Sequence, residues 1–214
     1  MTKISASLLA CDMAYLGQAV KELEDCGVDY LHLDVLDGHY VNNLSFGPKV
    51  VSDLKRITSL PIEVHFELYR AERLIDIFAE AGTDHMIIQR DCCDQPIRVL
   101  TQIRQLGVKA GLAINPGDGI DGIEHLFHYL DFISVMSVEP GFCGQPFEES
   151  CVNKVIRLKK LLRENNRHMP VYMDGGITIK IAEMIKSHGV DVMVVGNGLY
   201  NQGPLAQTVE DYRR

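Results

Sequence analysis

CGVDYLHLD, at residues 26–34, carries a pattern that three other stretches of the chain repeat: AGTDHMIIQ at 81–89, LGVKAGLAI at 106–114 and HGVDVMVVG at 188–196. In each stretch a glycine is followed closely by a short apolar run. Glycine is typical of the residue that ends a helix, because it adopts the left-handed backbone conformation without strain. A short aliphatic run is typical of a strand that is covered on both faces. The pattern therefore predicts helices that alternate with parallel strands.

The same alternation extends along the chain and predicts eight strands. Four amphipathic segments, Leu16–Cys26, Ala71–Ala81, Ile97–Leu106 and Ile179–His188, are each ended by a glycine. Eight such units fit a closed (β/α)8 barrel or an open doubly wound sheet. Regular spacing, and the absence of a GxGxxG motif after the first strand, favour a single α/β domain over residues 1–214, a (β/α)8 TIM barrel. The predicted strands are Ile4–Leu9, Tyr30–Val35, Ile62–Phe66, Met86–Gln89, Lys109–Ile114, Phe132–Ser137, Val171–Asp174 and Val192–Val195.

Composition limits the classes of function. The chain has 214 residues, a net charge of -8 and a sequence pI near 5.4. An acidic chain has no general attraction for nucleic acid or anionic membrane, so we expect neither as a partner. The longest apolar runs have the length of strands, and the apolar part of the N-terminus is too short for a signal peptide. Six cysteines without CxxC spacing then indicate reduced thiols and a cytoplasmic protein.

Histidine and carboxylate side chains stand at the ends of predicted strands. His32 and Asp34 are two residues apart, as are successive members of the set Glu63, His65 and Glu67. Residues two apart on a strand point to the same side, which in a barrel can be the interior. One such residue is often only a hydrogen-bonded core residue, but several buried together are costly unless a metal or mutual pairing compensates. Asp174 ends a further strand, and two histidines with two carboxylates at such strand ends predict a site for Zn²⁺ or another borderline divalent ion.

Other residues of reactive type are given no chemistry. We interpret the adjacent Cys92 and Cys93 as a solvent-facing or half-buried loop pair, with a metal or redox role as the alternative. The remaining histidines are interpreted as surface or hydrogen-bonded residues in loops or on helices: His39, His85, His125, His128, His168 and His188.

Glycine-rich stretches follow the last three predicted strands. They are EPGFCGQPF at 139–147, DGGIT at 174–178 and VGNGLY at 195–200. Glycine lets the backbone approach a ligand closely, and the loops after strands seven and eight are the usual phosphate site of such barrels. Backbone N–H groups can hold the anion there. We therefore expect a phosphate group to bind beside the predicted metal site.

Long motifs in this sequence resemble the ribulose-phosphate 3-epimerase family. They are SASLLACD at 5–12, HLDVLDGHYVNNLSFGP at 32–48, VHF at 64–66, NPG at 115–117, MSVEPGFCGQPF at 136–147, DGGIT and VGNGLY. The resemblance covers essentially the whole chain. It implies a (β/α)8 barrel that epimerises a phosphorylated ketose at C3 with a divalent metal, in the first instance D-ribulose 5-phosphate to D-xylulose 5-phosphate. It also implies a homo-oligomer.

Carried over residue by residue, the resemblance assigns roles to positions of this chain. His32, Asp34, His65 and Asp174 would hold one divalent ion, for which Zn²⁺ is the first choice and Fe²⁺, Mn²⁺ or Co²⁺ are alternatives. Asp34 and Asp174 would also be the catalytic acid/base pair, which moves the C3 proton through a metal-stabilised enediolate. Gly175, Gly176, Gly196 and Asn197 would bind the phosphate. The other substrate-binding residues would be Ser7, His65, Met136, Gly141, Phe142, Cys143 and Gly144, to which we add Glu67.

Some positions depart from the family pattern. Leu36 and Glu67 stand where the family usually has methionines, Gln89 where it often has histidine, and Asn197 where it usually has serine. Glu67 is an added carboxylate that would ligate the metal, bind a sugar hydroxyl or turn outward. The GQPF and GNGLYN stretches resemble relatives that act on D-allulose 6-phosphate, which is the alternative substrate.

Three further function classes fit the residues less well. A decarboxylase on a related barrel would need Asp-x-Lys-x-x-Asp, and the nearest match, Asp53–Thr58, lacks the final aspartate. A Schiff-base aldolase would need a lysine at a strand end, whereas Lys109 opens its strand. The last alternative is a non-catalytic phosphosugar-binding homologue. The changes at Leu36, Glu67 and Gln89 favour it, and the intact metal and acid/base positions argue against it.

Overall fold

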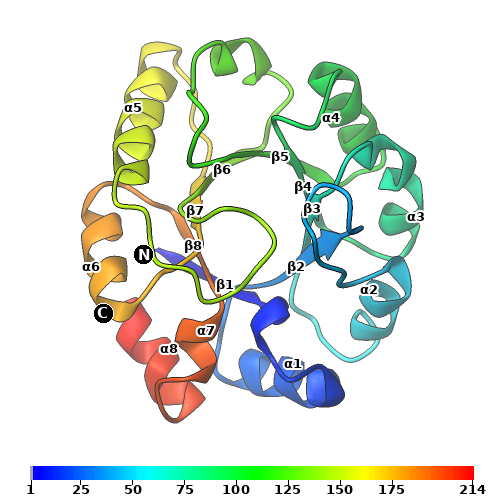
Figure 1. Cartoon of the computed structure of the whole chain (residues 1–214), viewed down its shortest axis with the longest axis vertical. Coiled ribbons are helices and arrows are strands. Elements are labelled where there is room, and N and C mark those ends of the chain that lie inside the picture. The colour runs from blue at the N-terminus through cyan, green and yellow to red at the C-terminus, as the bar shows by residue number, and fades with distance from the viewer. Residues whose placement is uncertain (1) are drawn as a thin grey trace.

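A computed structural model describes residues 2–214 and places eight parallel strands in one closed ring. Each strand pairs with the next along the chain, and β1 also pairs with β8, so the sheet has no free edge. Helices surround the ring (Figure 1). The predicted (β/α)8 TIM barrel is confirmed. The strands are β1 (Lys3–Ser7), β2 (Tyr30–Leu36), β3 (Ile62–Glu67), β4 (His85–Gln89), β5 (Lys109–Ile114), β6 (Phe132–Met136), β7 (Val171–Asp174) and β8 (Val192–Val195).

All of the predicted strands are present: β5, β7 and β8 have the predicted ends, and the other five differ by one or two residues at an end. The predicted helix over Ala71–Ala81 is shorter, because Ala71–Arg73 forms a 3-10 turn and the α-helix begins only at Ile75. The helix after β6 has no glycine end: its chain reverses at Asn166, where φ is 50°. The α-helices are α1 (Leu16–Asp25), α2 (Pro48–Leu54), α3 (Ile75–Glu80), α4 (Pro96–Gln105), α5 (Cys151–Glu164), α6 (Ile179–Ser187), α7 (Asn197–Tyr200) and α8 (Leu205–Arg213).

Two apolar regions hold the barrel together. The larger region lies between strands and helices and includes Leu33, Val64 and Phe66. A smaller one fills part of the barrel interior, where the ring of Phe132 packs with Tyr172. A Cβ at Gly111 would lie 2.4 Å from the Phe132 ring, so glycine at this position makes room for the ring. None of the helices in the described chain is long and apolar enough to cross a membrane.

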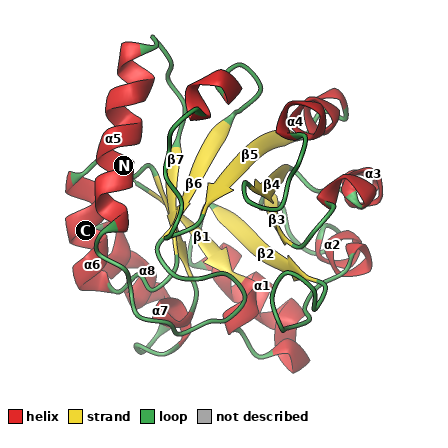
Figure 2. Ribbon diagram, turned by 45° about the horizontal axis from the view of Figure 1, so that its top comes forward, coloured by secondary structure: helices red, strands yellow, loops and turns green. Residues whose placement is uncertain are grey.

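The register of β2 and β3 arranges the polar interior in layers. His32 pairs with Glu63, Asp34 with His65, and Leu36 with Glu67. Side chains two residues apart share a face, so these layers stack from the middle of the barrel toward its carboxyl end. The loops that follow the strands surround that end (Figure 2). The yellow-green segment after β6 crosses the front of the barrel in Figure 1.

Candidate active site and metal centre

Two histidines and two aspartates converge inside the carboxyl end of the barrel. They are His32 and Asp34 on β2, His65 on β3 and Asp174 on β7. Both histidines are fully buried, and the aspartates are 7% and 8% exposed. One ligand atom from each residue can be chosen so that all of these atoms lie within 4.8 Å of one another. The structure therefore brings together the four residues that the sequence predicts as metal ligands.

The spacing of these atoms fits a divalent ion. His32 Nε2 lies 3.1 Å from Asp34 Oδ1 and 3.5 Å from Asp174 Oδ2. His65 Nδ1 lies 3.3 Å from Asp34 Oδ1 and 3.7 Å from Asp174 Oδ2. Ligands about 2.0–2.1 Å from a tetrahedral zinc ion lie roughly 3.4 Å from one another. These four distances, 3.1–3.7 Å, lie close to that separation.

Unpaired atoms at the cluster support the same interpretation. Within the described chain, neither ring nitrogen of His65 makes a hydrogen bond, and neither does Asp174 Oδ2. Buried polar atoms normally have a partner, so orphans of this kind call for one. A metal ion would satisfy the atoms of both residues that face the cluster. The buried His32, Asp34, His65 and Asp174 thus form a site that fits a divalent metal ion.

The two aspartates have opposite electrostatic surroundings. Burial is the largest influence on Asp34 and opposes ionisation, but His32 and His65 outweigh it and hold the pKa of Asp34 well below its usual range. At Asp174, burial raises the pKa to about 6, repulsion from Asp34 adds to the rise, and His32 and His65 oppose it. Two carboxyl groups whose pKa values are pushed apart are typical of an acid/base pair.

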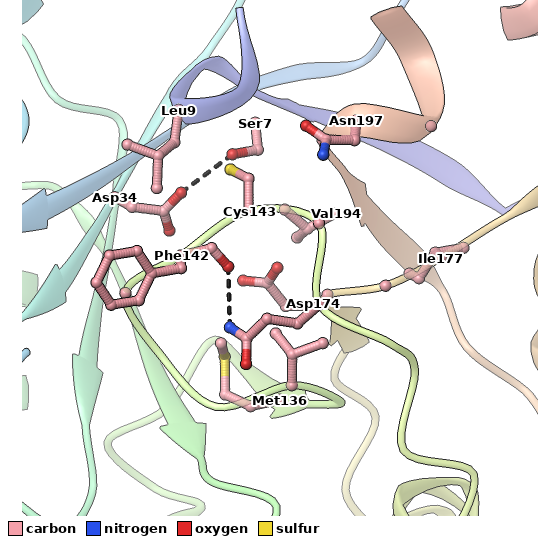
Figure 3. Close-up of a pocket in the computed structure, with 18 of the residues that line it drawn as sticks. Ser7, Leu9, Asp34, Met136, Phe142, Cys143, Asp174, Ile177, Val194 and Asn197 are labelled. Atoms are coloured by element: carbon pink, nitrogen blue, oxygen red, sulfur yellow. Dashed lines mark hydrogen bonds between the residues drawn. The ribbon is translucent and has the colours of Figure 1, made fainter. Parts of the chain in front are cut away.

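A cavity of about 320 Å³ opens above the cluster. Figure 3 shows Asp34 and Asp174 entering it from different strands, with Ser7 donating a hydrogen bond to Asp34 Oδ2 at 3.0 Å. Among residues 2–214, no lysine or arginine lines it. It is lined by every residue predicted to bind substrate or phosphate except His65, which lies buried beneath it: Ser7, Glu67, Met136, Gly141, Phe142, Cys143, Gly144, Gly175, Gly176, Gly196 and Asn197.

Glycines shape the side of the cavity formed after β6 and β7. Gly176 has a φ of 66°, and a Cβ there would lie 2.7 Å from the backbone nitrogen of Phe147. Only glycine accommodates both the positive φ and the close approach. Gln145 holds the loop after β6 by donating hydrogen bonds to the carbonyls of Glu139 at 2.6 Å and Phe142 at 2.9 Å. The sequence interpretation missed Gln145, although it lies inside the quoted GQPF stretch.

Glu67 points inward and lines the cavity, with 2% of its surface exposed. Burial, together with repulsion from Asp34 and Asp174, raises its pKa well above the ordinary value of 4.5. Its Oε2 makes no hydrogen bond in the described chain, and the same is true of both amide atoms of the buried Gln89 on the next strand. Two of the departures from the family pattern therefore place unpaired polar atoms at the carboxyl ends of β3 and β4.

One histidine lies in a different element from the one that the sequence predicts. The sequence interpretation assigns His85 to a loop or helix, but it opens β4 and is buried. Its Nδ1 lies 2.9 Å from Glu63 Oε1, so the expected hydrogen-bonded state is correct although the expected element is wrong. The difference arises because the predicted strand begins one residue later, at Met86. Cys92 and Cys93 are both half-buried and form no disulfide, as expected of two adjacent loop cysteines.

The chain resembles known proteins in sequence and in fold. The model of the "Ribulose-phosphate 3 epimerase family" matches residues 3–200. Ribulose-phosphate 3-epimerase of Bacillus subtilis is 34% identical over 214 residues, covering 100% of this chain and 99% of the relative. The chain belongs to the ribulose-phosphate 3-epimerase family. The enzyme of that name from Methanocaldococcus jannaschii is 32% identical over 213 residues, covering 100% of this chain and 90% of the relative.

A plant relative and two solved structures extend the comparison. The chloroplastic ribulose-5-phosphate-3-epimerase of Arabidopsis thaliana is 36% identical over 211 residues, covering 97% of this chain and 74% of the relative. The crystal structure of KGPDC from Streptococcus mutans superposes with a TM-score of 0.75 at 12% identity, covering 100% of this chain and 96% of the other. A 3-hexulose-6-phosphate synthase gives 0.68 at 14%, covering 99% and 98%. At these identities the solved structures support the fold alone.

Proposed function

We propose that residues 1–214 form one catalytic domain that epimerises D-ribulose 5-phosphate to D-xylulose 5-phosphate at C3, with one divalent ion, Zn²⁺ in the first instance, held by His32, Asp34, His65 and Asp174. One observation carries the proposal. Two aspartates reach one cavity from β2 and β7, beside two buried histidines, with pKa values pushed in opposite directions. Membership of the epimerase family supports the same reaction type.

The two aspartates would divide the proton transfer between two faces of the substrate. Inversion at C3 requires that a proton leave one face and return to the other, which a single fixed carboxylate cannot do. A bound divalent ion would act as a Lewis acid for the charge that develops on the C2 and C3 oxygens. Asp34 would accept the proton from one face in one direction, and Asp174 would return a proton to the other face. The roles exchange in the reverse direction.

The phosphate would bind at the glycine loops after β7 and β8. Gly175, Gly176, Gly196 and Asn197 line that side of the cavity. Since no cationic side chain lines the cavity in the described chain, backbone N–H groups would hold the anion. The grip on a remote phosphate would orient C3 between the aspartates. Ser7, Met136 and the Gly141–Gly144 segment would enclose the rest of the sugar, while His65 would act from beneath through the metal.

Glu67 would bind the end of the sugar remote from the phosphate. β3 lies four strands from β7 around the ring, so Glu67 faces the cavity from the side opposite the phosphate loop. The unpaired Oε2 of Glu67 would accept or donate a hydrogen bond at the C1 hydroxyl. We expect Glu67→Met to raise KM for the ketose phosphate more than it lowers kcat, because this contact would form before the chemical step. Unchanged substrate preference and unchanged metal content in this variant would contradict the role.

D-allulose 6-phosphate is the second candidate substrate. Its additional hydroxymethylene carbon would lie between C3 and the phosphate. The cavity wall there carries three amide side chains, Asn197, Asn201 and Gln202, which can hydrogen-bond a further hydroxyl. A homo-oligomer and a cytosolic location are further parts of the proposal. All six cysteines are unpaired, which supports a reducing compartment.

The test is to incubate the metal-loaded enzyme with ribulose 5-phosphate in D₂O and to follow the C3 proton by NMR. Deuterium at C3, together with rapid appearance of xylulose 5-phosphate, is the expected result. Exchange with little product, combined with fast turnover of allulose 6-phosphate, would select the six-carbon substrate. Absence of exchange with every ketose phosphate, despite bound metal, would overturn the proposed activity.

A further inference from the structure

A second group of polar side chains lies inside the barrel beneath the metal cluster, and the proposed chemistry gives it no role. Its centre is Glu63 on β3, whose surface is 0% exposed. Ser5 Oγ donates a hydrogen bond to Glu63 Oε2 at 2.5 Å, and the Tyr172 hydroxyl donates one to Oε1 at 2.9 Å. His85 Nδ1 lies 2.9 Å from the same Oε1. These contacts come from β1, β7 and β4, on both sides of β3.

The contacts fix Glu63 as an ionised carboxylate. A buried charge is costly unless hydrogen-bonded partners surround it. The hydroxyls of Ser5 and Tyr172 donate to its two oxygens, and His85 Nδ1 lies at hydrogen-bond distance, so the geometry supplies the partners that an ionised carboxylate needs. An ionised carboxylate only accepts hydrogen bonds, so each nitrogen or oxygen that contacts it must carry a hydrogen. Ser5, His85 and Tyr172 therefore hold Glu63 in place independently of the metal ligands.

His32 is the fourth partner of Glu63. Its Nδ1 lies 3.5 Å from Glu63 Oε2. The other ring nitrogen, Nε2, faces Asp34 Oδ1 at 3.1 Å and Asp174 Oδ2 at 3.5 Å. With the hydrogen of the neutral ring on Nδ1, the lone pair lies on Nε2 and points at the cluster. The opposite tautomer would direct an N–H into the cluster and leave Nδ1 facing a carboxylate without a hydrogen between them.

We propose that Glu63 is the positioning residue that sets His32 as a metal ligand: its anchored carboxylate accepts the Nδ1 hydrogen of His32 and so keeps the Nε2 lone pair directed between Asp34 and Asp174. Metal-binding histidines generally donate their second ring hydrogen to such an acceptor, and loss of the acceptor typically weakens metal affinity about 10–100-fold. The inference rests on the proposed metal-dependent function in one respect, that His32 ligates the ion.

Metal affinity gives the first test. Zn²⁺ is titrated into the metal-free protein in competition with a chromophoric chelator, for the wild type, Glu63→Gln and Ser5→Ala. Glu63→Gln should bind Zn²⁺ about 10–100-fold more weakly, because the amide no longer dictates the His32 tautomer. Ser5→Ala is the matched control: it removes one contact to Oε2 but leaves the carboxylate held by Tyr172 and His85, so its affinity should stay much closer to the wild type than that of Glu63→Gln.

The tautomer of His32 gives the second test, which does not depend on the folding of a variant. In the zinc-loaded, ¹⁵N-labelled wild type, long-range ¹H–¹⁵N spectra should show His32 with its hydrogen on Nδ1 and zinc on Nε2. Zinc on Nδ1, or equal affinity in Glu63→Gln and the wild type, would overturn the positioning role while leaving the proposed activity intact. A wild type that binds no divalent ion at this site would overturn the proposed metal-dependent function, and the positioning role with it.

Discussion

Two carboxyl groups on one strand, Glu63 and Glu67, both point into the barrel interior, but their surroundings differ. Glu63 accepts hydrogen bonds from Ser5 and Tyr172 and has a lowered pKa. Glu67, in the layer nearest the cavity, has an unpaired Oε2 and a raised pKa. The lower carboxylate carries its charge because the protein supplies the partners. The upper one lacks partners because that part of the barrel faces the cavity.

The same difference extends to the layers around each glutamate. His65, Gln89 and Asp174 have buried atoms without hydrogen bonds in the described chain, and all lie toward the carboxyl end of the barrel. Buried polar groups normally have partners, so unpaired ones indicate where a ligand is accommodated. Buried polar groups that have hydrogen-bond partners, such as Glu63, indicate which part of the barrel supports that site. Among the carboxyl, imidazole and amide groups inside the barrel, hydrogen-bond satisfaction thus distinguishes the layer nearest the cavity from its support more clearly than burial does, because both layers are buried.

Removal of the metal should have the largest effect on activity. The structural effect should be confined to the upper layer, the one nearest the cavity. Exhaustive dialysis against a chelator should lower turnover of the ketose phosphate by at least about 10³-fold, because several kcal/mol of charge stabilisation are lost. Adding back Zn²⁺, Mn²⁺ or Co²⁺ should restore activity. Circular dichroism of the metal-free protein should still show the folded barrel, because the polar groups of the lower layer around Glu63 hydrogen-bond to one another without the metal. Full turnover after complete metal removal would contradict this expectation.

Replacing each glutamate by glutamine should destabilise the protein to different extents in the two layers. Glu63→Gln should lower the free energy of unfolding of the metal-free protein by about 3–5 kcal/mol, because it breaks a buried charged network. Glu67→Gln should change it by less than about 1 kcal/mol, because a neutral amide replaces a carboxyl whose ionisation is opposed by burial and by repulsion from Asp34 and Asp174. Urea unfolding at pH 7 measures both. Equal losses in the two variants would show that the layers do not differ as described.

The pH dependence of stability should have opposite signs at the two positions. The folded pKa of Glu63, about 2, is below its ordinary 4.5, so its contribution is present above pH 4.5 and is lost as pH falls toward 2. The folded pKa of Glu67 is above 4.5, so its contribution is full below that pH and is lost as pH rises. The advantage of the metal-free wild type over Glu63→Gln should therefore shrink in acid. Glu67→Gln should gain on the wild type as pH rises. Parallel pH profiles for both variants would contradict these signs.

The sequence predicts the strands and the ligand cluster because both depend on local patterns. Apolar runs after glycine locate the strands, and period-two spacing puts His32 with Asp34 on one face. Family motifs supply Asp174 and the glycines predicted to bind phosphate, which the structure places around one cavity.

The partners of Glu63 could not be predicted in the same way. Ser5, His85 and Tyr172 come from strands far apart in the chain, and contact between them depends on how the closed barrel staggers its strands. No local pattern distinguishes Tyr172, which donates to Glu63, from an apolar residue that fills the barrel. The one available signal was Glu63 itself, which lies on the same face as His65 and two residues before it.

The most direct measurement follows deuterium at C3 in metal-loaded Asp34→Asn and Asp174→Asn. Each variant should lose epimerisation, by about 10²–10⁴-fold or more, yet exchange hydrogen at C3 of one epimer only: the remaining aspartate still serves its own face. Asp34→Asn and Asp174→Asn should therefore exchange opposite epimers. Exchange at C3 of both epimers by either variant would contradict the account. So would the absence of exchange in both variants while metal remains bound. Either result would show that Asp34 and Asp174 are not the acid/base pair that acts on the two faces of C3.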